Sequence, residues 1–230
     1  MSVFLKIVGP EANFARGKRM QKGKMILLAL AVSCGLIGCG QDKEPEISTV
    51  SIGKDGTITH QIVGSFEQNY YEMDGLQALA ADRVAEYCDD KGEDSVTLTS
   101  VEEKDGKVQI QLGYATDQDY SNFNNRELYV GMLTDAYTKG YPLEGVPFVS
   151  ADGKPVEFGD MEDSDAKKIV IIATKPTEEL VVNTYGKVLY INRGMANEPE
   201  VSFYGKKGAH ITYPANEDTD ESVLSYIIFE

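Results

Sequence analysis

The chain has 230 residues with 22 basic and 37 acidic side chains, which give a formal charge of −15 at pH 7. Residues 1–38 hold six of the basic residues and one of the acidic ones, so the remaining 192 residues carry a charge of −20. Nucleic-acid binding needs clustered cations that neutralise phosphates, and this composition therefore argues against a nucleic-acid partner.

The first predicted element is a signal peptide over residues 1–38. Residues 25–38 form an apolar run that follows two lysines and ends in a small residue, as secretory signals do. Fourteen residues are few for a membrane-spanning helix, which needs about 20, although an uncleaved anchor helix is the alternative. Residues 1–19 add further charge upstream, which indicates that Met20 is the true start.

The end of this run, Leu36-Ile37-Gly38-Cys39, resembles the bacterial lipobox. The resemblance implies that Cys39 becomes the N-terminal residue and carries a diacylglycerol anchor with a fatty acid such as palmitate. We expect a lipoprotein on the extracytoplasmic face of the cell membrane, with residues 39–47 as a polar tether and residues 48–230 as the exported domain. The acidic surface leaves this lipid as the attachment to the membrane.

The first half of the exported domain alternates hairpins with helices. Apolar residues at alternate positions predict one hairpin around a turn at 53–56 and a second around a turn at 103–106. Between them we expect a helix that Asp74 caps in a capping box with Gln77. The apolar face of this helix is expected to be Leu76, Leu79, Ala80, Val84, Tyr87 and Cys88. After the second hairpin we expect a short helix with an N-cap at Thr116 and with Tyr120 and Phe123 turned inward. A strand at 128–133 and a helical turn at 134–139 are expected to follow it.

From residue 146 onward the pattern is almost entirely β. Residues 169–173 are a continuous apolar run, which predicts a strand covered on both faces. The fold class that follows is α+β, with antiparallel hairpins, one main packed helix and a β-rich C-terminal part. A boundary between two lobes is predicted in the acidic segment 159–168. The other strands are expected at 146–149, 156–158, 180–182, 188–191, 201–204, 209–213 and 223–229.

No catalytic, metal-binding or cofactor-binding motif is present, and we assign no residue to such a role. His60 shares a strand face with Ile58 and Ile62, which favours a core-edge histidine over a base or metal ligand. His210 is expected to face solvent, and Cys88 to be a small buried residue.

There are two acidic clusters, at residues 160–165 and 217–221, and in the first of them Asp160, Glu162 and Ser164 imitate the alternation of a calcium loop. The central glycine and the closing glutamate of an EF-hand are missing, so solvated loops or a helix start are the preferred interpretation and a weak calcium site is the alternative.

Thirteen tyrosines and no tryptophan make up an unusual aromatic composition. Exposed tyrosines are common at binding surfaces, but tyrosine in strands is also ordinary packing. The missing tryptophan counts against a sugar-binding surface. The residues considered for a tyrosine face are Tyr70, Tyr71, Tyr185, Tyr190, Tyr204 and Tyr226.

The leader, the SIGKDGTITHQIV hairpin, the region 70–87 and the late strands GKVLYIN and SYIIFE are together similar to uncharacterised surface lipoproteins of clostridia-type Gram-positive bacteria. The resemblance implies lipidation and an exported, largely β domain. We expect a non-catalytic module that binds an envelope protein, peptide or polymer. The alternative is an extracytoplasmic hydrolase of cell-wall or other polymers that uses paired carboxylates.

A Cys39→Ala variant tests the predicted anchor. Without the thiol no lipid can be attached, so we expect the variant in the medium or left unprocessed in the membrane. Cell fractionation followed by mass measurement of the N-terminus distinguishes these states. A variant that is correctly cleaved and still fully membrane-bound would contradict the lipoprotein prediction.

Overall fold

The computed structural model describes residues 46–65, 72–161, 166–176, 178–194, 198–213 and 221–230. The predicted signal peptide, Cys39, most of the tether, Tyr70, Tyr71 and most of both acidic clusters lie outside these residues. The elements of the described part are β1 (Ser48–Ile52), β2 (Ile58–Ser65), α2 (Met73–Lys91), β3 (Val96–Lys104), β4 (Lys107–Tyr114), α3 (Asp117–Asn124), β5 (Leu128–Met132), α4 (Leu133–Thr138), β6 (Phe148–Ser150), β7 (Pro155–Val156), a 3-10 turn (Phe158–Asp160), β8 (Lys168–Thr174), β9 (Leu180–Asn183), β10 (Val188–Asn192), β11 (Glu200–Tyr204), β12 (Gly208–Thr212) and β13 (Val223–Phe229).

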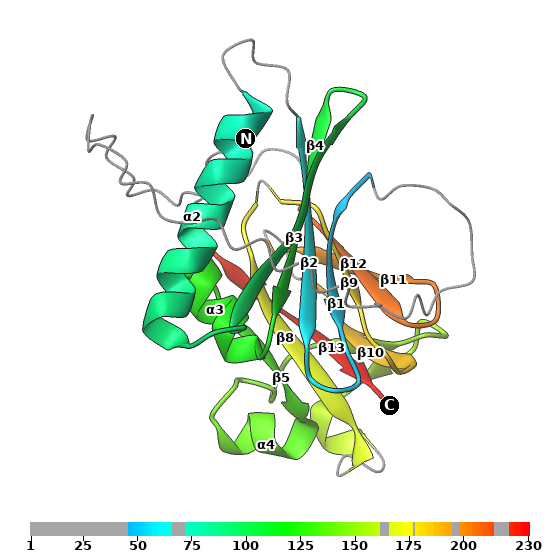
Figure 1. The fold of residues 1–230 in the computed structure, drawn as a ribbon. Helices are drawn as coiled ribbons and strands as arrows, with labels where there is room; N and C mark the ends of the chain where they lie inside the picture. The colour runs from blue at the N-terminus through cyan, green and yellow to red at the C-terminus, as the bar shows by residue number, and fades with distance from the viewer. Residues whose placement is uncertain (1–45, 66–71, 162–165, 177, 195–197, 214–220) are drawn as a thin grey trace.

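The strands form two sheets, shown in Figure 1. One has seven strands in the order β11-β12-β9-β1-β2-β4-β3, and the other has six in the order β5-β8-β13-β10-β6-β7. Neighbouring strands are antiparallel, except that β1 and β9 run parallel. The predicted α+β class with antiparallel hairpins is confirmed. Hairpin patterns did not predict two sheets, because strand order depends on contacts between distant segments.

Both sheets take strands from each side of segment 159–168, where a boundary between lobes was predicted. β5 precedes this segment and pairs with β8, which follows it. β1 precedes it and pairs with β9, which follows it. The chain on the two sides of the segment is therefore interleaved in the sheets, and residues 162–165 themselves lie outside the described residues.

The main core lies between the two sheets. Val50 and Ile110 of the seven-stranded sheet belong to the same buried cluster as Ile172 and Phe229 of the six-stranded sheet. In Figure 1, β8 and β13 run obliquely behind β1 and β2. Alternate side chains of each strand therefore meet across the interface, as in other sheet-on-sheet packings.

The six-stranded sheet is buried on its other face as well. Ile169 and Ile171 belong to a second core cluster, whereas Val170 and Ile172 belong to the main one, and all four are 0% exposed. Leu133 of α4 is also part of the second cluster. The prediction that residues 169–173 form a strand covered on both faces is thus confirmed.

Helix α2 packs its predicted apolar face on the main core. Leu76 and Ala80 are buried, and the half-buried Cys88 donates from Sγ to the carbonyl of Val96 at 3.2 Å. The predicted capping box is wrong: the helix begins one residue before Asp74, with Glu72 at the N-cap and no side-chain cap hydrogen bond. Asp74 lies instead in the first turn, where a negative charge is favourable beside the positive end of the helix dipole.

The second hairpin and α3 follow their sequence signals closely. Asp105 and Gly106 form the two-residue β3–β4 turn and have φ values of 52° and 72°. Positive φ at both positions is what a two-residue hairpin turn needs to match the right-handed twist of its strands. The predicted N-cap of α3 is confirmed, since Thr116 Oγ1 accepts from the Asp119 amide at 3.1 Å. Tyr120 is buried as predicted. None of the helices in the described part of the chain combines the length and apolarity needed to cross a membrane.

Substitution Ile172→Ala tests the importance of β8. The side chain is fully buried in the main core, so its truncation should lower the free energy of unfolding by about 2–5 kcal/mol. Thr97→Ala, on the exposed surface of β3, is the control and should change it by less than about 0.5 kcal/mol. Urea unfolding of both variants measures the difference, and equal stabilities would contradict the described core.

Candidate functional site

The tyrosines considered from the sequence do not form one face. Tyr190 and Tyr226 pack in the second core cluster. Tyr185 packs edge-on against Phe229 at a ring distance of 5.2 Å. Tyr204 is 53% exposed. Packing on the core therefore accounts for Tyr190, Tyr226 and Tyr185, of which Tyr185 lies in the turn between β9 and β10.

His60 is a core-edge histidine, as the sequence predicts. It is 8% exposed on the inner face of β2, and its ring lies 5.4 Å from the ring of Tyr120. Among the described residues no group of three or more His, Cys, Asp or Glu side chains is placed to bind a metal ion.

His210 lies on the outer face of the seven-stranded sheet. Its Nε2 is 2.9 Å from Glu179 Oε1, and its ring is 6.2 Å from that of Tyr204. Ser202 is its partner across the strands, but Ser202 Oγ donates to the backbone carbonyl of His210 at 3.5 Å. The Ser202 hydroxyl therefore bonds to the backbone rather than to the imidazole in this structure.

Tyrosines and carboxylates instead form two contact groups, each of which includes residues of α4 or of the loop that follows it. We call the two groups together the tyrosine–carboxylate surface and define it as Glu127, Tyr129, Tyr137, Lys139, Tyr141, Glu144 and Phe158.

One half of this surface is built on Tyr129 of β5, which is itself buried in the second core cluster. Its ring lies 5.1 Å from the ring of Tyr141, and Lys139 Nζ lies 4.5 Å from its centroid. The Tyr141 hydroxyl donates to Glu127 Oε1. Gly131 is needed here, because a Cβ at that position would overlap the Tyr129 hydroxyl.

The other half is an exposed aromatic stack. Tyr137, on α4, is 48% exposed, and its ring stacks on Phe158 with centroids 5.5 Å apart and an interplanar angle of 26°. The Tyr137 hydroxyl donates to Glu144 Oε1 at 2.7 Å. The packing against Phe158 and the hydrogen bond at the tip restrict the orientation of the ring, and about half of the side chain stays exposed.

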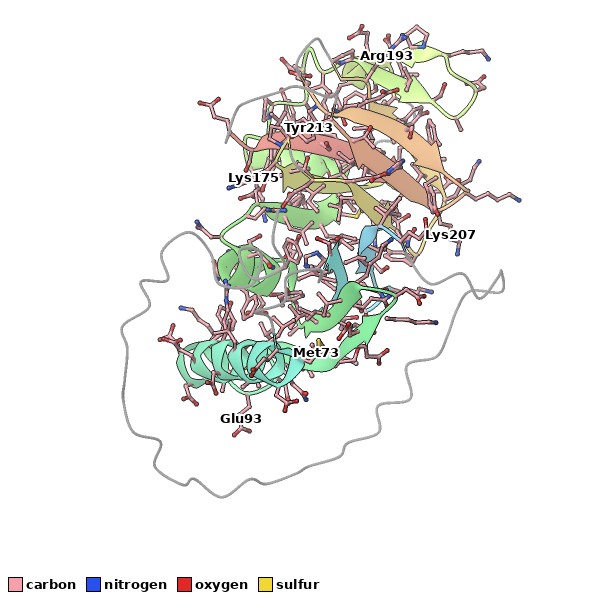
Figure 2. The ribbon with its side chains drawn as sticks, turned by 90° about the horizontal axis from the view of Figure 1, so that it is seen from above. Met73, Glu93, Lys175, Arg193, Lys207 and Tyr213 are labelled. Carbon is pink, nitrogen blue, oxygen red and sulfur yellow. The ribbon has the colours of Figure 1, made fainter. Side chains whose placement is uncertain are left out.

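A buried ion pair fixes the backbone that carries Glu127. Arg126 donates to both carboxylate oxygens of Glu178, at 2.6 and 2.8 Å, and both side chains are largely buried. Glu178 also accepts from the Lys175 amide, and the Tyr213 hydroxyl donates to the carbonyl of Thr174 at 2.6 Å. Figure 2 shows Lys175 and Tyr213 close together on one side of the molecule. This network ties the end of β8 to the start of β5.

The tyrosines of the surface remain hydroxyl donors at physiological pH. Burial, followed by the hydrogen bond to Glu127, raises the pKa of Tyr141 far above its usual value. The hydrogen bond to Glu144 raises the pKa of Tyr137. A carboxylate has about four acceptor sites, so Glu127 and Glu144 each keep capacity for a ligand hydroxyl. The surface thus offers a flat aromatic ring, carboxylate acceptors and one ammonium donor.

The sequence held no periodic signal for this surface. Tyr141 and Glu144 lie beyond the end of α4 at Thr138, so helical spacing does not relate them to Tyr137. The predicted helical turn at 134–139 corresponds to α4. Tyr129 and Phe158 join through tertiary packing, for which the local pattern holds no signal.

The comparisons add no family or relative to this description: no protein-family model, no curated protein and no solved structure matches the chain.

Substitution Glu144→Gln tests the geometry of the exposed stack. Because the hydrogen bond and charge of Glu144 are the main causes that hold the pKa of Tyr137 above 10, the amide should bring this pKa down toward that value. Absorbance at the phenolate band during alkaline titration measures the change, and Tyr137→Phe assigns the affected phenol. Glu127→Gln serves as the control and should leave Tyr137 unchanged. Identical titrations of wild type and Glu144→Gln would contradict the contact.

Proposed function

We propose that this chain is a lipid-anchored, extracytoplasmic binding module of a bacterial cell surface, attached to the membrane through Cys39. We further propose that its tyrosine–carboxylate surface binds a polyhydroxylated envelope polymer, that is, a glycan. The protein acts by binding rather than by catalysis in this proposal.

The stack of Tyr137 on Phe158 is the observation that carries the proposal. A ring that is 48% exposed and fixed at its tip offers a rigid apolar platform at a small cost in side-chain entropy. Sugar rings have one apolar face of similar size and a rim of hydroxyls. The platform would contact the apolar face of the sugar while Glu144 accepts hydrogen bonds from its hydroxyls. The stack of Tyr137 on Phe158 would thus provide the aromatic stacking surface that tryptophan often provides in sugar-binding proteins.

The hydrolase that uses paired carboxylates stays a prediction. Its chemistry needs a carboxylic acid whose pKa is raised so that it is protonated when it acts. The pKa values of three aspartates are lowered instead, because each carboxylate accepts a hydrogen bond. The pairs are Asp55 with Thr57, Asp90 with Lys91, and Asp152 with Lys154. No observation at the tyrosine–carboxylate surface favours cleavage over binding.

The proposal is tested with the full chain and insoluble bacterial cell-wall glycan from which proteins have been removed. Tyr137→Ala should weaken binding at least about tenfold, which corresponds to about 1.4 kcal/mol, because an exposed aromatic anchor is lost. Tyr204→Ala removes a tyrosine that is about equally exposed, on β11, and should leave the affinity within about twofold.

Co-sedimentation over a range of glycan concentrations gives both affinities. If wild-type protein does not bind the glycan, the polymer class is wrong. If Tyr137→Ala and Tyr204→Ala weaken binding equally, the glycan is bound elsewhere. Release of soluble sugar by wild-type protein would favour the hydrolase instead.

A further inference from the structure

Four lysines gather at one end of the two-sheet core, although the exported part of the chain is strongly acidic. Lys207 Nζ donates to the backbone carbonyl of Tyr185 at 2.9 Å, and Lys168 Nζ donates to the hydroxyl of the same tyrosine. We call this group the lysine cluster and define it as Lys168, Lys187, Lys206 and Lys207.

The register of three strand ends brings these lysines together. The amide of Val188 donates to the carbonyl of Lys206 at 2.9 Å, which joins the β9–β10 turn to the β11–β12 turn. Lys187 exchanges two backbone hydrogen bonds with Glu230, and Lys168 pairs with Phe229. Lys187, Lys206 and Lys207 are exposed, and Lys168 is half-buried. Among the residues that the structure describes, Glu230 is an acidic residue that this register places beside Lys187.

The cluster lies at the opposite end of the sheet from the point where the chain enters the domain. Ser48 begins β1 beside Leu180 in the parallel β9, and β9 then runs to Asn183, next to the turn that carries Tyr185. Figure 1 shows the start of β1 far from the β1–β2 turn and the C-terminus of β13. In Figure 2, Lys207 and Tyr213 mark opposite ends of β12. A tether attached before β1 would therefore join the domain at the end of the sheet opposite the lysines.

We propose that the lysine cluster binds a linear polyanion with repeated phosphate groups that extends beyond the membrane surface. Ammonium groups on separate turns act as point charges and suit flexible phosphates, without the fixed fork geometry that arginine imposes. The ionic atmosphere screens charges beyond about 10 Å at 0.1 M salt, so acidic side chains on distant elements such as α2 do not cancel the local field. The extension beyond the membrane surface rests on the proposed anchorage through Cys39, whereas the binding itself does not.

The test uses the full chain and long-chain inorganic polyphosphate, with affinity measured in solution at about 0.1 M and about 0.3 M salt. Lys187→Glu/Lys206→Glu should weaken binding at least about tenfold, and wild-type affinity should fall at the higher salt. The matched control is Lys104→Glu/Lys107→Glu, because it makes the same change in net charge on the exposed β3–β4 turn. It should change the affinity less than about twofold.

A second pair, Lys187→Gln/Lys206→Gln, with its thermal unfolding midpoint measured, separates lost binding from lost folding. Reduced affinity with an unchanged midpoint supports the proposal. Equal weakening by the cluster and control variants, or no polyphosphate binding by wild type at the lower salt, overturns it. Vesicles of phosphatidylglycerol form a separate arm: binding to them that the cluster variant abolishes would identify lipid headgroups as the partner and overturn the proposed polymer. None of these outcomes depends on glycan binding at Tyr137.

Discussion

Burial of β8 on both faces is the constraint on which the rest of the structure depends. Each fully buried isoleucine or valine contributes about 1.5–3 kcal/mol relative to exposure. Val170 and Ile172 face the seven-stranded sheet, while Ile169 and Ile171 require a second cover. Leu133 and Ala136 of α4 are part of that cover. The tyrosine–carboxylate surface exists where it does because α4 must lie over the outer face of β8.

The distribution of charge matters more than its total. The formal charge is strongly negative, and Figure 2 shows oxygen-tipped side chains directed outward along α2. The lysine cluster nevertheless lies together at a different end, held by hydrogen bonds among three strand ends. Since salt screens distant charges in water, two regions of one acidic molecule can differ in the ligands that they attract. Net charge alone gave no indication of such a region.

Sequence patterns predicted individual residues better than their assembly into a site. The inward positions of His60, Tyr120 and Phe123 follow from alternation and helical spacing, and all three are buried. The sequence left both a binding face and ordinary strand packing open for Tyr190 and Tyr226, and both pack in the second core cluster. Tyrosine suits both a half-buried strand and a binding surface, so its identity does not decide between them. Whether a tyrosine is packed or available for binding depends on which face of its strand is covered by other elements.

The sequence by itself determined the hairpins, the apolar face of α2, the cap at Thr116 and the doubly buried character of β8. Each of these depends on residues close together in the chain, where the periods of strand and helix are visible. Only the tertiary structure decided that the strands divide between two sheets and that Thr49 pairs with Val181. It also decided that Tyr129 meets Tyr141 and that Lys207 reaches Tyr185. The physical reason is that these contacts depend on how well distant surfaces fit together, and no local period records that fit.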